Sequence, residues 1–149
     1  MPPVESDLLA RIQRLEDIKE IEGLIYRYAW HVPRGEGKEL GELFAEDGVL
    51  NASARFQGRT RIAEYISSLP ANLTIPVVSN ILVELDGDNA RATCKMTSLW
   101  VGDGPALVGW YEDEFRRVAG RWLFSHRRWR SHDRPAAGSK VPPASAQKD

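Results

Sequence analysis

Apolar residues recur at steps of three or four along the first thirty positions of the chain. The positions that share this spacing are Leu8, Ile12, Leu15, Ile18, Ile21, Ile25, Tyr28 and Val32. Such a period predicts one face of a long amphipathic helix, with the intervening charged residues on a solvated face. Ser6 or Asp7 is suited to cap its start, and Pro33 with Gly35 predicts its end.

Two shorter helices and one strand are expected next. Leu40, Leu43 and Phe44 predict the apolar side of a helix over 38–45, and a strand follows over 49–55. Thr60 is suited to cap a third helix that runs to about residue 69, before a proline.

The rest of the chain predicts four successive strands, over 74–85, 89–101, 106–118 and 121–131. Residues typical of turns, rich in Gly and Asp, separate them. Because the helices come first and the strands follow in series, alternating β-α-β units are excluded. The fold class is therefore α+β, with a strongly bent antiparallel sheet.

Length and composition indicate the number of domains, the kinds of partner and the cellular location. The chain has 149 residues and a formal net charge of −1, which suits one domain and gives no general attraction to nucleic acid. Cys94 is the only cysteine, which favours a reducing compartment. No apolar run approaches a membrane span and no signal peptide is recognisable, so we expect a cytoplasmic location. We expect the domain over 1–134 and a disordered tail over 135–149, where Pro, Ala and Ser dominate.

Several short motifs follow one another in a familiar order. They are LEDIKEI (15–21), YRYA (26–29), LFAEDGV (43–49), VSN (78–80), ELDGDNARA (84–92), WYEDEF (110–115) and GRW (120–122). In this order the sequence resembles SnoaL-like proteins of the nuclear transport factor 2-like superfamily. The resemblance implies a cone, in which a curved antiparallel sheet wraps on three N-terminal helices around one pocket. It also implies homodimers paired through the outer sheet face, and relatives that include polyketide cyclases, dehydratases, dehydrochlorinases, formaldehyde lyases and isomerases.

The sequence departs from these relatives at two positions. Members that eliminate HCl or water resemble one another in an Asp near the end of the first helix and a His on the first long strand. Here these positions align with Pro33 and Pro76. Neither proline titrates, so the base of this chemistry would have to come from elsewhere.

Three residues are the candidate catalytic groups. Tyr28 matches a pocket tyrosine of related dehydratases, although a core tyrosine is the simpler alternative. His31 lies three residues later and could replace the missing base, or could be a histidine favoured by a helix end. Arg127 aligns with a pocket position and could stabilise an anion, unless it is solvated within its basic run. Strand alternation places Arg127 and Trp129 on one face, which we expect to be the inward one.

Four residues are the candidate substrate-binding groups: Met96, Ser98, Tyr111 and Trp129. The first three match strand positions that line the pocket in relatives, although aromatic residues are also common in cores. The three histidines and scattered carboxylates form no spacing typical of a metal site, and no phosphate loop or dinucleotide motif occurs. We therefore expect no metal and no cofactor.

The sequence predicts a cofactor-independent lyase or isomerase. Its substrate would be a small hydrophobic, aromatic or cyclic molecule, and its chemistry acid–base proton abstraction and elimination in an apolar pocket. The alternative is a non-catalytic ligand-binding or assembly module of the same fold, which the two prolines favour. We expect no nucleic-acid or membrane partner.

Overall fold

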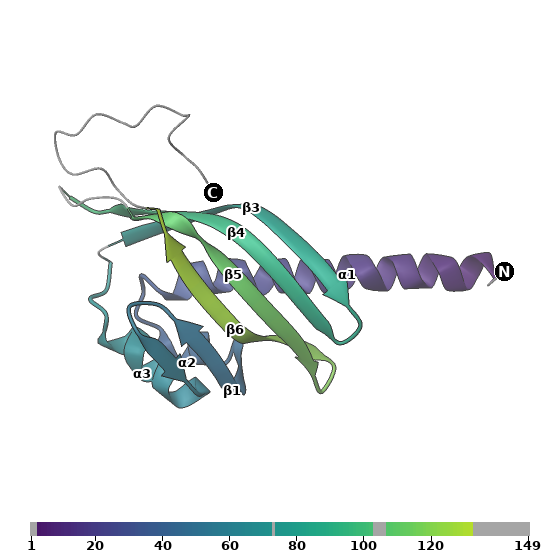
Figure 1. Ribbon diagram of the computed structural model, residues 1–149, viewed down its shortest axis with the longest axis horizontal. Coiled ribbons are helices and arrows are strands. Elements are labelled where there is room, and N and C mark those ends of the chain that lie inside the picture. Colours follow the sequence, from purple (N-terminus) through teal and green to yellow (C-terminus); the bar gives the residue numbers. More distant parts are fainter. Residues whose placement is uncertain (1–2, 73, 103–106, 133–149) are drawn as a thin grey trace, which may run out of the picture.

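The computed structural model describes residues 3–72, 74–102 and 107–132. Two helices, a short hairpin and a third helix come first, and four long strands follow (Figure 1). The elements are α1 (Val4–His31), α2 (Gly37–Gly41), β1 (Phe44–Asn51), β2 (Arg55–Gln57), α3 (Arg59–Ser68), β3 (Thr74–Asp86), β4 (Asn89–Trp100), β5 (Leu107–Val118) and β6 (Arg121–Ser131).

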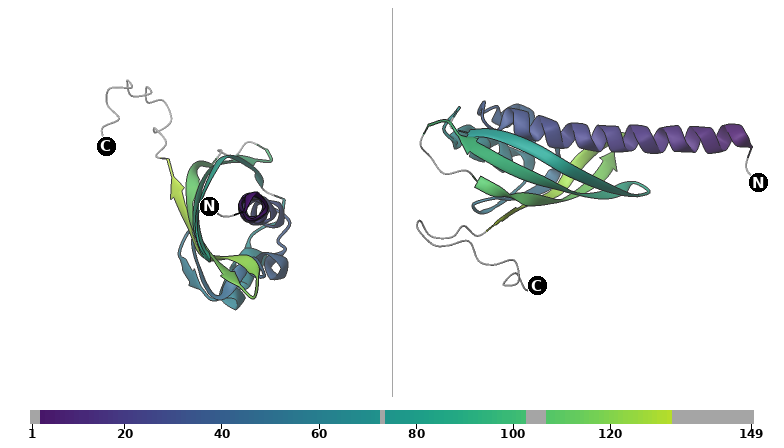
Figure 2. Two further views of the ribbon diagram at one scale, coloured as in Figure 1. Left: turned by 90° about the vertical axis from the view of Figure 1, so that its right-hand side faces the viewer. Right: turned by 90° about the horizontal axis from the view of Figure 1, so that it is seen from above.

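The strands form one curved sheet in the order β2-β1-β6-β5-β4-β3 (Figures 1 and 2). The predicted α+β class is confirmed, with the helices on the N-terminal side of the chain. The sheet is mixed rather than antiparallel, because β1 runs parallel to β6 while the other neighbouring pairs are antiparallel. Parallel neighbours need a long connection, and here β2, α3 and the three strands β3 to β5 separate β1 from β6 in the chain.

Helix α1 lies on the inner side of the curved sheet (Figure 2). Its C-terminal half contributes Ile21, Leu24, Ile25 and Tyr28 to a core that the inward residues of the strands complete. Alternation along the strands supplies this inner face, since successive side chains point to opposite sides of a sheet. The core therefore fills the space between α1 and the sheet.

A buried carboxylate fixes the helix to the last hairpin. Asp17 accepts hydrogen bonds from Nη1 and Nη2 of Arg117 at 2.9 and 3.0 Å, and from Nε1 of Trp122 at 3.0 Å. The Arg117 guanidinium lowers the pKa of Asp17 below its usual value, against the opposing effect of burial. This contact sets where α1 crosses the sheet.

The predicted apolar face of α1 is covered only in part. Leu8, Ile12 and Leu15 are exposed. The first turns of the helix extend beyond the sheet (Figure 1). Leu15 is two residues before Asp17, about 200° around the helix, so it points away from the side that Asp17 turns to the sheet. The predicted Ser6 or Asp7 cap is also wrong: the helix starts at Val4, and Pro3 precedes it.

The second helix is shorter than predicted, and the strand after it begins earlier and ends at Asn51 instead of Arg55, which starts β2. α2 ends at Gly41, and Phe44 already belongs to β1, where it pairs with Phe124 of β6. Tertiary pairing thus overrides the local helical pattern. The third helix and the four long strands are confirmed to within one or two residues. The expected tail over 135–149 lies outside the described residues.

No helix in the described part of the chain is long and apolar enough to cross a membrane. The same part holds no cluster of three or more His, Cys, Asp and Glu side chains placed to bind a metal ion.

Candidate functional site

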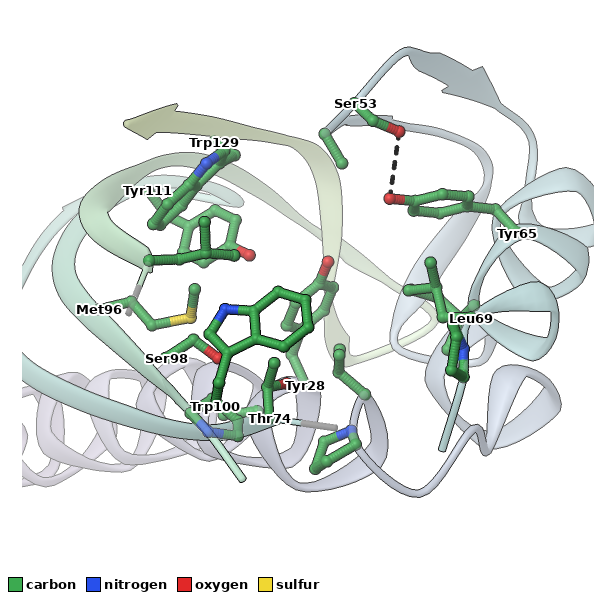
Figure 3. Close-up of a pocket in the computed structure, with 18 residues that line it drawn as sticks. Tyr28, Ser53, Tyr65, Leu69, Thr74, Met96, Ser98, Trp100, Tyr111 and Trp129 are labelled. Carbon is green, nitrogen blue, oxygen red and sulfur yellow. Dashed lines mark hydrogen bonds between the residues drawn. The ribbon is translucent and has the colours of Figure 1, made fainter. Parts of the chain in front are cut away.

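A cavity of about 370 Å³ opens between the end of α1, helix α3 and the curved sheet (Figure 3). Its walls are mostly apolar. The residues that line it are Tyr28, Ala29, Val32, Pro33, Ala52, Ser53, Tyr65, Ile66, Leu69, Pro70, Thr74, Pro76, Met96, Ser98, Trp100, Leu107, Tyr111 and Trp129. A space of this size and polarity is typical of sites for small organic molecules.

Five of the predicted site residues line this cavity together. They are Tyr28, Met96, Ser98, Tyr111 and Trp129. Strand register explains the grouping, since Tyr111 of β5 pairs with Trp129 of β6, and their ring centres are 5.0 Å apart. Their roles in binding or catalysis remain predictions.

Arg127 faces the inner side of the sheet, as strand alternation predicts, but it does not line the cavity. Its side chain is fully buried, one layer behind the wall. The guanidinium carbon lies 4.2 Å from the ring centre of Tyr28 and 3.5 Å from that of Tyr111. We call these two tyrosines the phenol pair. Arg127 therefore reaches the cavity only through their rings.

His31 is not among the lining residues, and its Nδ1 lies 3.7 Å from the Glu36 carboxylate. One residue of an α-helix turns by about 100°. Four residues after Tyr28, Val32 returns to the cavity side, whereas His31, after three, is rotated away from it. The geometry gives no support to His31 as the base.

Pro33 and Pro76 both line the cavity. The two positions that the family resemblance aligns with a titratable pair therefore face this space, and both are prolines here. Among the described residues, those that line the cavity include no Asp, Glu, His, Lys, Arg or Cys. The side chains that titrate there are phenols.

The two hydroxyl groups of the phenol pair are neutral. Burial raises the pKa of Tyr28 well above its usual value, and the neighbouring Tyr111 adds to this while Arg127 opposes it. Burial also raises the pKa of Tyr111, again against Arg127. Both hydroxyl groups are therefore protonated at neutral pH.

Other polar groups in the wall escaped the sequence analysis. The Nε1 of Trp100 is buried with no hydrogen-bond partner among the described residues. Ser53 donates a hydrogen bond of 3.3 Å to the hydroxyl of Tyr65 at one side of the cavity (Figure 3). Trp100 is two residues after Ser98 on β4, so strand alternation from Ser98 would also have pointed to Trp100.

Asp113 is the main charged residue that the sequence analysis missed. It lies directly opposite Arg127 in the β5–β6 register, and both side chains are fully buried. Asp113 lies between Tyr111 and Phe115 at alternate positions of β5, and both of these side chains point inward. Strand alternation therefore could have predicted that Asp113 also points inward.

The SnoaL-like domain family matches residues 13–128. The chain belongs to this family. Its structure is similar to an NTF2-like protein with a cystatin-like fold from Novosphingobium aromaticivorans, at 29% identity and TM-score 0.81, over 92% of this chain and 95% of that one. The predicted family is thereby confirmed.

Two further solved structures share the fold. The hexachlorocyclohexane dehydrochlorinase LinA (type 2) has TM-score 0.73 and 17% identity, over 90% of this chain and 98% of that one. A single-residue variant of Rv3472 of Mycobacterium tuberculosis, described as of unknown function, has TM-score 0.72 and 23% identity, over 91% of this chain and 87% of that one. A search among proteins of curated function finds no match.

Proposed function

We propose that this SnoaL-like protein is a cofactor-independent lyase or isomerase for a small aromatic or cyclic substrate. The observation that carries the proposal is the buried Arg127 cation, which lies against both rings of the phenol pair at the cavity wall. A buried cation beside a phenol ring favours any negative charge that the hydroxyl takes on. In the proposed reaction the pair releases and recovers a proton, and Arg127 offsets part of the burial that raises both pKa values.

The absence of carboxylate or imidazole from the cavity lining of the described residues narrows the chemistry. The reaction that fits best is loss of water from a carbon next to an activating group. A phenol of the pair gives its proton to the departing hydroxyl, the C–O bond breaks and water leaves. The phenolate then takes the proton from the adjacent carbon, and the double bond forms. Arg127 stabilises the phenolate between the two transfers.

A substrate screen tests this proposal. Purified protein is incubated with small aromatic and cyclic alcohols and ketones, and products that have lost water or shifted a double bond are followed by mass spectrometry and NMR. General acid–base groups contribute about 10²–10⁴-fold each. We therefore expect Tyr28→Phe and Arg127→Met each to lower turnover at least about tenfold.

The matched control is Tyr26→Phe. Tyr26 is on the same helix but is 53% exposed and does not line the cavity. This variant should keep full turnover. Wild-type turnover in both Tyr28→Phe and Arg127→Met, with circular dichroism unchanged, would reject the assignment.

A second candidate function is ligand binding without catalysis. It is favoured by Pro33 and Pro76, which occupy the cavity positions where relatives carry titratable groups. Binding can be followed by the fluorescence of Trp100 and Trp129 in the wall. A compound that quenches this fluorescence and is recovered unchanged, while no compound in the screen is converted, would favour the binding module.

A further inference from the structure

Asp113 and Arg127 form a buried ion pair that has few hydrogen-bond partners. The two side chains face each other across β5 and β6, with Nη1 of Arg127 3.5 Å from Oδ2 of Asp113. Among the described residues, neither carboxylate oxygen accepts a hydrogen bond, and Nε and Nη1 of Arg127 donate none. Nη2 of Arg127 reaches only the Cys94 sulfur, at 3.9 Å.

Such a pair is a poor device for stability. Burying two charges costs more than their attraction returns unless further hydrogen bonds complete them. Buried polar groups that lack partners are concentrated where a protein uses them. The position of this pair suggests a function, because Arg127 contacts both rings of the phenol pair. The side chain of Asp113 is sealed from solvent behind Arg127 and does not line the cavity beside those rings.

We propose that Asp113 is a positioning residue: it holds the Arg127 guanidinium against the phenol pair, and its charge sets how strongly these phenols donate into the cavity. When Asp113 is ionised, it neutralises the cation behind the rings. When Asp113 is protonated, the full charge of Arg127 acts on the phenols and makes them better proton donors. The inference rests on the proposed function, because it gives the site its preferred ligand: a ring compound whose oxygen gains negative charge.

The groups around Asp113 allow this change of charge. Arg127 faces Asp113 from β6. Cys94 of β4 and Tyr111 of β5 are close enough to interact with its charge. Tyr28 of α1 is linked to it only through Arg127. Arg128 and Glu112, on the outer face of the sheet, act on it in opposite directions. Burial raises the pKa of Asp113 to about 7, against the attraction of Arg127 and Arg128.

Fluorine NMR of the phenols tests the inference without any ligand. The full chain is made with 3-fluorotyrosine at its four tyrosines, and Phe variants assign the resonances. Between about pH 5 and about pH 8, below the range in which an exposed fluorotyrosine ionises, we expect the resonances of the phenol pair to shift together with a midpoint near that of Asp113. The exposed Tyr26 should not follow this step.

Two carboxyl variants complete the test. Asp113→Asn should abolish the step, and Glu112→Gln, which changes a neighbouring carboxylate on the outer face, should retain it. Resonances that stay flat in the wild type, or a step that persists in Asp113→Asn, would overturn the inference. If Asp113→Asn does not fold, Asp113→Glu takes its place. The midpoint pH of the step must then change in Asp113→Glu and must stay unchanged in His31→Gln.

The outcome separates this inference from the proposed function. Flat phenol resonances reject the role of Asp113 and leave the substrate screen unaffected. A screen without turnover rejects the lyase or isomerase, while the fluorine measurement still reports on the phenol pair alone.

Discussion

The indole of Trp129 lies directly over Gly109 of the neighbouring strand. A Cβ at Gly109 would be 2.0 Å from the carbonyl oxygen of Arg130, and 2.7 Å from the Trp129 ring. The absence of a side chain at Gly109 is therefore what allows this indole to form part of the cavity wall.

Gly109→Ala should displace Trp129 and weaken binding in the cavity. Overpacking of this kind costs about 1–3 kcal/mol, and urea unfolding followed by circular dichroism measures the loss. The control is Gly23→Ala in α1, where a Cβ would meet nothing within 4 Å. That variant should gain about 0.5–1 kcal/mol. Equal stability of the two variants would contradict the packing described here.

The buried carboxyl of Asp113 should make stability depend on pH. Its pKa is about 7 in the folded chain and about 3.9 in an unfolded one. Between these values the folded protein keeps a proton that the unfolded protein has released. The free energy of unfolding should therefore fall as pH rises through this window, by up to about 1.4 kcal/mol per unit, and level off above it.

Asp113→Asn isolates this effect. The difference in unfolding free energy between wild type and this variant, measured in urea, should decrease from about pH 5 to about pH 7. Glu112→Gln should run parallel to the wild type over the same range. A difference that stays constant with pH would show that Asp113 does not bind a proton in this window.

Asp17 should anchor α1 to the last hairpin. Its carboxylate accepts three hydrogen bonds from Arg117 and Trp122. Asp17→Ala should therefore lower the free energy of unfolding, measured in urea, by about 2 kcal/mol. Its lowered pKa means that this contribution is lost as pH falls below about 3.8, where the unfolded chain binds the proton first. Asp88 also binds Arg117 but is 82% exposed, so Asp88→Ala should cost at most about 1 kcal/mol. Similar losses in the two variants would contradict the anchoring role.

The outer face of the sheet should form a homodimer. Ile75 pairs with Leu99, and Val77 aligns through Thr97 with Val108, so four large apolar side chains are exposed side by side. Light scattering should give twice the mass of one chain for the wild type, and the mass of a single chain for Val77→Glu. Val118→Glu, exposed at the far end of β5, should leave the dimer intact. A monomer mass for the wild type would reject this expectation.

Local patterns in the sequence determined the elements and the faces of the strands. The periods of 3.6 and 2 depend only on neighbours a few residues away, so they fixed α1, the four long strands and the inward side of Arg127 and Trp129. The family resemblance then predicted the curved sheet and a pocket inside it, and Tyr28 and Tyr111 do line one cavity together.

Only the tertiary structure decided how deeply each side chain is buried and which distant residues it contacts. A period says which way a side chain points, but not which distant segment covers it. Leu8, in the part of α1 that extends beyond the sheet, is therefore exposed despite its helical pattern. For the same reason Arg127 lies behind the phenol pair instead of in the cavity, and Asp113, which resembles a solvated acid in its run, is sealed against it.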